Sequence, residues 1–131
     1  MNPVVESLIR RTFQESGDGR IHFGQVVAVL IDAGVESYAV DYRADRATYY
    51  LPDGDTLDLA LEDAGAVIAQ EFSQEALIAA IRGAQRGEVM YPQFKKLSQA
   101  AGCIAYTVWL TGRHVSYFGR HGEVHIEHFP S

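Results

Sequence analysis

The sequence predicts an α+β fold built from two copies of an α-α-β-β-β unit with antiparallel sheet. Three observations predict it: an internal repeat, apolar stripes at helical spacing, and glycine-marked turns between short segments rich in β-forming residues. We expect a single domain over 1–131, with repeats at 4–62 and 73–131. A connector at 63–72 would join the repeats, and the whole should have pseudo-twofold character.

A shift of 68 residues aligns 21–62 with 89–130 without a gap. Seven of the 42 aligned positions are identical, whereas chance would give about two or three. The identical positions are Gln25/Gln93, Ala33/Ala101, Gly34/Gly102, Tyr38/Tyr106, Val40/Val108, Tyr49/Tyr117 and Gly54/Gly122. The matched glycines fall where the chain needs turns, so the pattern favours a duplication.

Each copy begins with two predicted helices. The first copy has an apolar stripe at helical spacing over 4–13, with charged residues off the stripe. In the second copy Ser73 is a good N-cap, and Gly87 fits the position after the last helical turn. The second helices are expected at about 23–33 and 91–101, each ended by a glycine.

Three strands rich in Val, Tyr, Ile and Phe follow in each copy. They are expected near 35–43, 47–52 and 55–61, and near 103–111, 114–120 and 123–129. Asp53-Gly54 is a two-residue hairpin signal, and His121-Gly122 occupies the same place in the second copy. Gly112 marks another turn, and the connector can form a short helix.

Two-residue turns would fix which side chains share a face of the second sheet. Phe118 would then oppose His125, and Ser116 would oppose Glu127. The face expected to pack on the helices is apolar and holds Tyr106, Val108, Leu110, Val115, Tyr117, Val124 and Ile126. The opposite face mixes aromatic and ionisable groups and holds Thr107, Trp109, Ser116, Phe118, Arg120, Glu123, His125 and Glu127.

The first copy carries leucines where the second carries ionisable side chains. Leu57 and Leu59 match His125 and Glu127 in the alignment. Either a β-bulge shifts the register of one copy, or this face is covered in the first copy and lines a groove in the second. Both alternatives point to the same residues as a candidate site.

The candidate ligand-binding residues are Trp109, Ser116, Phe118, Arg120, Glu123, His125 and Glu127. An aromatic pair on a face with charges is what a binding surface contains. An imidazole beside carboxylates can do acid–base work near neutral pH, which makes His125 and Glu127 the candidates for catalysis. No nucleophile with a matched base accompanies them, so no catalytic residue is assigned.

No metal or cofactor is expected. The spacing of His121, His125 and His128 resembles a metal cluster, but alternation along a strand points His125 and His128 to opposite faces. The sequence has no glycine-rich phosphate loop that opens a helix. Cys103 and the tyrosines at matched positions are interpreted as core residues.

Charge and composition exclude several classes of protein. The 131 residues carry a formal net charge of −6, with −9 in residues 1–81 and +3 in residues 82–131. The acidic chain lacks a Lys/Arg run, which disfavours nucleic acid, and it has no stretch long enough for a membrane span. No signal peptide is visible, and the single cysteine favours a cytoplasmic setting. The opposite charges of the two parts would suit contact within the fold or in a homodimer.

Several stretches resemble the YbcV-like family of unknown function, whose bacterial members are often labelled phage envelope proteins. They are GVESYAVDY, ATYYLPDG, IAQEFS, AIRGAQRGEVMYPQF and AGCIAYTVWLTGRHVSYFGRHGEVHIEHFP. The resemblance implies a small bacterial protein and no established reaction, cofactor or catalytic residue.

The sequence therefore predicts an uncharacterised cytoplasmic protein that is a non-enzymatic ligand-binding or protein-interaction module. The first alternative is an enzyme that uses His125 and Glu127 on a small anionic molecule positioned by Arg120. The second is a phage-derived structural subunit that binds copies of itself or a virion partner.

Overall fold

The fold is α+β, with four helices and one six-stranded antiparallel sheet in the described residues, 1–62 and 67–130 of a computed structural model. The helices are α1 (Pro3–Gly17), α2 (Phe23–Asp32), α3 (Gln74–Gln85) and α4 (Tyr91–Ala100). The strands are β1 (Ser37–Asp41), β2 (Arg46–Tyr50), β3 (Thr56–Ala60), β4 (Cys103–Trp109), β5 (His114–Gly119) and β6 (Val124–His128). The predicted fold class and antiparallel sheet are confirmed.

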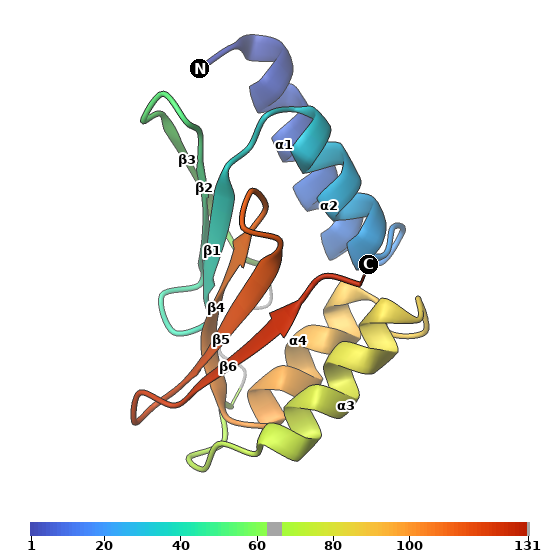
Figure 1. The fold of residues 1–131 in the computed structure, drawn as a ribbon, viewed down its shortest axis with the longest axis vertical. Coiled ribbons are helices and arrows are strands. Elements are labelled where there is room, and N and C mark those ends of the chain that lie inside the picture. The colour runs from blue at the N-terminus through green and yellow to red at the C-terminus, as the bar shows by residue number, and fades with distance from the viewer. Residues whose placement is uncertain (63–66, 131) are drawn as a thin grey trace.

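The two halves of the chain share one sheet, with strand order β3-β2-β1-β4-β5-β6. They join through the antiparallel pair β1–β4, where Tyr38 lies opposite Val108 and Val40 lies opposite Tyr106. The helices lie on one side of the sheet, α1 beside α2 and α3 beside α4, and the C-terminal end runs between the two pairs (Figure 1). The sheet therefore has a covered inner face and an uncovered outer face.

The predicted helix ends are confirmed by local hydrogen bonds and backbone angles. Ser73 caps α3 by accepting a hydrogen bond from the backbone N–H of Ala76 at 3.2 Å. Gly34, Gly87 and Gly102 follow the C-caps of α2, α3 and α4, with φ of +83°, +74° and +87°. These are left-handed conformations in which a side chain is strained.

The β2–β3 and β5–β6 turns contain three residues, so the predicted two-residue turns are wrong. Gly119 N–H donates to the carbonyl of Glu123 at 2.9 Å, which leaves residues 120–122 as the loop. In β2–β3, Leu51 N–H donates to the carbonyl of Asp55 at 2.9 Å, and residues 52–54 form the loop. The third loop residue is a glycine with positive φ in both turns, which is the known pattern of a three-residue hairpin.

The extra turn residue changes which side of β6 faces the helices. Ser116 pairs with Ile126 and Tyr117 pairs with His125, one residue away from the predicted register. Because side chains alternate along a strand, a one-residue slip exchanges the two faces. Val124 and Ile126, predicted to be core residues, are instead 52% and 51% exposed.

The core lies between the inner face of the sheet and the helices. Fully buried apolar side chains include Ile9 of α1, Leu30 of α2, Leu77 of α3 and Val108 of β4. Cys103 is also fully buried, as predicted, and burial raises the pKa of its thiol to about 11. The tyrosines at matched positions are buried as well, which confirms them as core residues.

The connector is held along the C-terminal end of α4. Ala69 N–H donates to the carbonyl of Gln99 at 3.0 Å, and Ser73 N–H donates to the carbonyl of Ala101 at 2.8 Å. Residues 67–72 are not helical. The helix expected in the connector falls partly on 63–66, which lie outside the described residues. In the described part of the chain, no helix combines the length and apolar character that a membrane span requires.

The close approach of the connector to Gly102 predicts an unequal effect of two alanine substitutions. A Cβ at Gly102 would lie 2.2 Å from the carbonyl oxygen of Glu71, whereas a Cβ at Gly34 would meet nothing within 4 Å. Gly34→Ala should lower the free energy of unfolding by about 1 kcal/mol, for the left-handed backbone. Gly102→Ala should lower it by about 3 kcal/mol, because overpacking adds to that cost. Urea unfolding measures both values, and equal losses would contradict the close contact.

Candidate functional site

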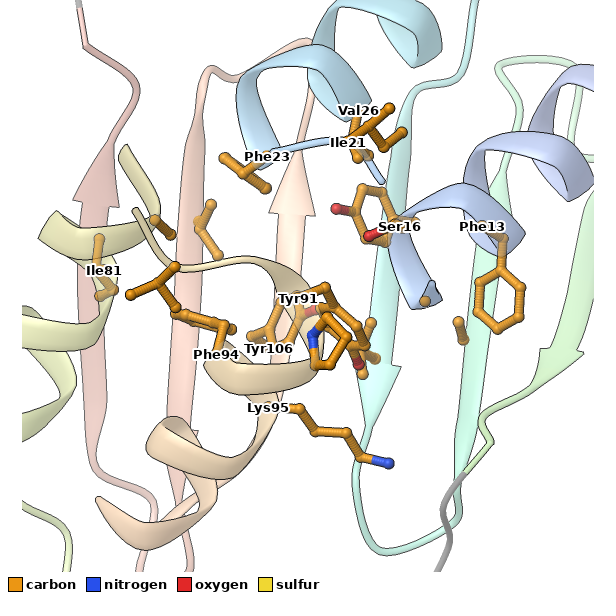
Figure 2. Close-up of a pocket in the computed structure, with 18 of the residues that line it drawn as sticks. Phe13, Ser16, Ile21, Phe23, Val26, Ile81, Tyr91, Phe94, Lys95 and Tyr106 are labelled. Carbon is orange, nitrogen blue, oxygen red and sulfur yellow. The ribbon is translucent and has the colours of Figure 1, made fainter. Parts of the chain in front are cut away.

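A cavity of about 590 Å³ lies between the inner face of the sheet and the helices. Side chains of all four helices and of β1, β2, β4, β5 and β6 line it, so both halves of the chain contribute (Figure 2). This volume is within the range of small-molecule sites in proteins, about 300–1,000 Å³. The cavity is therefore the candidate functional site.

Four tyrosines of the inner face form the floor of the cavity, one each from β1, β2, β4 and β5. Tyr38 and Tyr49 stack with ring centroids 5.0 Å apart, and Tyr106 and Tyr117 lie 5.6 Å apart. The ring of Phe94, from α4, lies 6.2 Å from both Tyr106 and Tyr117. The floor thus presents two groups of aromatic rings, one from each half of the chain.

The walls of the cavity are apolar and aromatic. Phe13 comes from α1, Phe23 and Val26 come from α2, and Ile81 comes from α3 (Figure 2). Phe23 meets Phe129 edge to face at 6.2 Å, so the C-terminal segment closes one side. Rings and branched side chains of this kind favour flat or apolar molecules.

Two buried polar atoms of the lining have no hydrogen-bond partner in the described part of the chain: the hydroxyl of Tyr91 and Oε1 of Gln99. Gln99 is only 2% exposed. Burial raises the pKa of Tyr91 to about 12, although the nearby Tyr106 hydroxyl partly offsets the effect. The Tyr91 hydroxyl is therefore neutral at physiological pH. A buried polar group without a partner costs about 1–3 kcal/mol, so each atom would be stabilised by a hydrogen bond from a water or from a bound molecule.

The predicted ligand-binding face divides between the two sides of the sheet. Trp109, Ser116 and Phe118 share the outer face, where the indole N–H of Trp109 donates to Oγ of Ser116 at 3.1 Å. His125 and Glu127 lie on the inner face, opposite Tyr117 and Val115. The prediction that these five residues share one face is wrong, because the turn before β6 has three residues rather than two.

His125 and Glu127 form a hydrogen-bonded group with α3. His125 Nε2 lies 3.2 Å from Glu127 Oε1, and its Nδ1 lies 3.0 Å from Nε2 of Gln74. Arg82 forms an ion pair with Glu127, and Gln85 donates to the same carboxylate at 3.3 Å. Both ring nitrogens of His125 are occupied, and its ring does not line the cavity. The arrangement suits a structural contact between β6 and α3.

The pKa of Glu127 is lowered by this group. Burial by itself raises the pKa, but hydrogen bonds from His125, Arg82 and Gln85 outweigh it and bring the value below the ordinary 4.5. The ionised carboxylate is therefore the form that holds β6 against α3.

Arg120 and Glu123 lie in the β5–β6 turn, away from the cavity. The guanidinium of Arg120 donates to the backbone carbonyls of Ile68 and Ala69, at 2.9 and 3.3 Å. Glu123 accepts from the backbone N–H of His121 at 2.9 Å, and backbone hydrogen bonds in this turn lower its pKa. Arg120 thus ties the connector to the turn, and the predicted anion site does not assemble around it. Among the described residues, no three His, Cys, Asp or Glu side chains converge as a metal site.

The sequence reasoning missed Gln99 and Tyr91, although a signal for Gln99 was present. The buried face of α4 carries Lys95, Ser98 and Gln99, where the repeat alignment has Val27, Leu30 and Ile31. Polar residues on the buried side of α4, where the aligned positions of α2 carry aliphatic residues, were the signal that this helix holds buried hydrogen-bonding groups.

Comparison with known proteins places the chain in a family. Residues 21–128 match the family described as "Protein of unknown function (DUF1398)", so the chain belongs to it. Uncharacterized proteins from Mycobacterium bovis and Mycobacterium tuberculosis are similar, with 30% identity over 109 residues. That region covers 82% of this chain and 66% of the relatives, so the chain spans less than two thirds of their length.

The Glu127 group predicts a pH-dependent loss of stability. Glu127→Gln should lower the free energy of unfolding at pH 7 by about 1–2 kcal/mol, because charge-assisted hydrogen bonds are lost. Because the folded-state pKa is lowered, this contribution is complete above pH 4.5 and disappears as the pH falls through the folded-state value. The difference from the wild type should therefore shrink in acid.

Urea unfolding between pH 3 and pH 7 measures this difference. The control is Glu88→Gln, which removes an exposed ion pair with Arg86 and should cost less than about 0.5 kcal/mol. A Glu127→Gln loss as small as that of the control, or one that grows in acid, would contradict the role of the carboxylate.

Proposed function

We propose that this protein binds a small molecule in the cavity between the sheet and the helices. The observation that carries the proposal is a cavity of about 590 Å³ with an aromatic floor and two buried, unpaired polar atoms. Ligand sites combine a mostly apolar lining with a few polar groups that fix orientation. This proposal keeps the ligand-binding role predicted from the sequence. It places the binding site in the cavity and not on the outer face of the sheet.

The size and lining of the cavity favour a ligand over solvent. Its volume corresponds to roughly 20 water molecules at about 30 Å³ each. Most of the lining residues are aromatic or aliphatic, so much of the water in the cavity would lie against apolar surface. Displacing water from such surface is favourable, which supports a ring-containing occupant.

The geometry gives less support to the enzymatic alternative. Both ring nitrogens of His125 are engaged in hydrogen bonds, Nε2 with Glu127 and Nδ1 with Gln74. The enzymatic alternative also needs Arg120 to position an anionic substrate. The guanidinium of Arg120 instead donates to the backbone carbonyls of Ile68 and Ala69. A protein-interaction role, a homodimer, a cytoplasmic location and a YbcV-like or phage-derived origin stay predictions from the sequence.

We also infer that the cavity lies at the junction of a duplicated α-α-β-β-β unit. Both halves have the same order of elements, and positive φ angles recur at positions 68 residues apart. These are Gly34/Gly102, Asp45/Arg113 and Gly54/Gly122. The floor of the cavity consists of the matched pairs Tyr38/Tyr106 and Tyr49/Tyr117, which supports a site with equivalent contributions from both copies.

Filling the cavity should abolish ligand binding without unfolding the protein. The probe is N-phenyl-1-naphthylamine, an uncharged aromatic dye that fluoresces in apolar sites. Ala84→Phe places a ring in the cavity from α3 and should weaken dye binding at least tenfold, because the space is taken. Fluorescence titration measures the affinity, and thermal unfolding checks the fold.

The matched control is Ala79→Phe, on the exposed side of the same helix, which should leave dye binding unchanged. If Ala84→Phe does not fold, Ser16→Phe fills the cavity from α1. A wild-type protein that does not bind the dye, or a folded cavity variant that binds it as well as the wild type does, would refute the proposed function.

A further inference from the structure

The unpaired amide oxygen of Gln99 restricts what the cavity can hold. Gln99 lies on α4, lines the cavity and is 98% removed from solvent, since it is 2% exposed. Its Oε1 has no partner in the described part of the chain, and an amide oxygen can accept hydrogen bonds but cannot donate them. A ligand that satisfies this atom must therefore present an O–H or N–H group.

The buried charges of the lining are already engaged. Glu127 is held by Arg82, Gln85 and His125. The ammonium of Lys95 donates to the backbone carbonyl of Glu62 at 2.8 Å and extends away from Tyr91 and Tyr106 (Figure 2). A charge placed over the tyrosine floor would lie away from this ammonium and would lack a nearby counter-charge, which is costly. The part of the ligand over the floor should therefore be uncharged.

The tyrosine floor adds hydrogen-bonding groups beside flat surfaces. Tyr38, Tyr49 and Tyr117 line the cavity, and burial raises the pKa of each hydroxyl. Neutral hydroxyls can donate to or accept from a ligand. A ligand ring can stack on the flat tyrosine rings, and an oxygen or nitrogen substituent on that ring can form hydrogen bonds with their hydroxyls.

We propose that the ligand is an uncharged, flat aromatic compound whose hydroxyl or N–H group donates to Oε1 of Gln99. This inference rests on the proposed function, because it specifies the molecule that the cavity binds. Gln99 is then the residue that selects ligands with a donor over ligands of the same shape without one.

A set of three naphthalenes tests the proposal. 2-Naphthol is uncharged and has a donor, 2-methoxynaphthalene has the same ring without the donor, and 2-naphthoate is an anion. Isothermal titration of the wild type should give an affinity for 2-naphthol at least tenfold higher than for either other compound, since one buried hydrogen bond is worth about a factor of ten. In Gln99→Leu the preference for 2-naphthol over 2-methoxynaphthalene should fall to within about twofold.

Stability provides an independent measurement. Because Gln99→Leu replaces an unsatisfied polar group by an apolar one of similar size, the Tm should stay the same or rise. Gln93→Leu, on the exposed side of α4, is the matched control and should keep the ligand preference of the wild type. If Gln99→Leu does not fold, Gln99→Met takes its place.

The outcomes separate the two proposals. Failure of all three naphthalenes to bind the wild type would overturn the proposed function together with this inference. Binding in the cavity with no preference for 2-naphthol, a preference for 2-naphthoate, or a preference that survives in a folded Gln99 variant would overturn the ligand class and leave the proposed function standing.

Discussion

The antiparallel pairing of β1 with β4 is the interaction on which the rest of the structure depends. It joins two three-stranded halves into one sheet, with Tyr38 opposite Val108 and Val40 opposite Tyr106. Because side chains alternate across a strand, this single register places the tyrosines of both halves on the same face. The helix pairs must cover that face to bury it, and the cavity is the space that remains between them.

The same alternation explains how one turn residue decides the chemistry of β6. A three-residue loop before β6 turns His125 and Glu127 toward α3 and leaves Val124 and Ile126 exposed. The inward polar side chains find Arg82, Gln85 and Gln74, so the ionisable groups that looked like a surface site are satisfied inside the fold. The first half has the same loop length but carries Leu57 and Leu59 at these positions, where Leu59 belongs to the apolar core and Leu57 packs against it.

The order of the elements and the helix ends could be predicted because they depend on local chemistry. Glycine at positive φ and a serine N-cap stabilise helix ends by contacts within a few residues, and Ser73, Gly34 and Gly102 behave as expected. The residues of the candidate site were predicted less successfully than the helix ends. Glycine signals such as His121-Gly122 occur in both two-residue and three-residue turns, and in the turn before β6 the difference reverses a whole face.

The sequence by itself determined the α+β class, the order of the elements and the ends of the helices, since these follow from periodicity and turn chemistry within short segments. The tertiary structure decided where the polar groups point and what they meet. The residues around Gln99 in the sequence are typical of a helix. Its amide oxygen is buried without a partner only because α4 packs over the tyrosine floor. Satisfaction of a buried polar atom depends on residues distant in the chain, which no local pattern specifies.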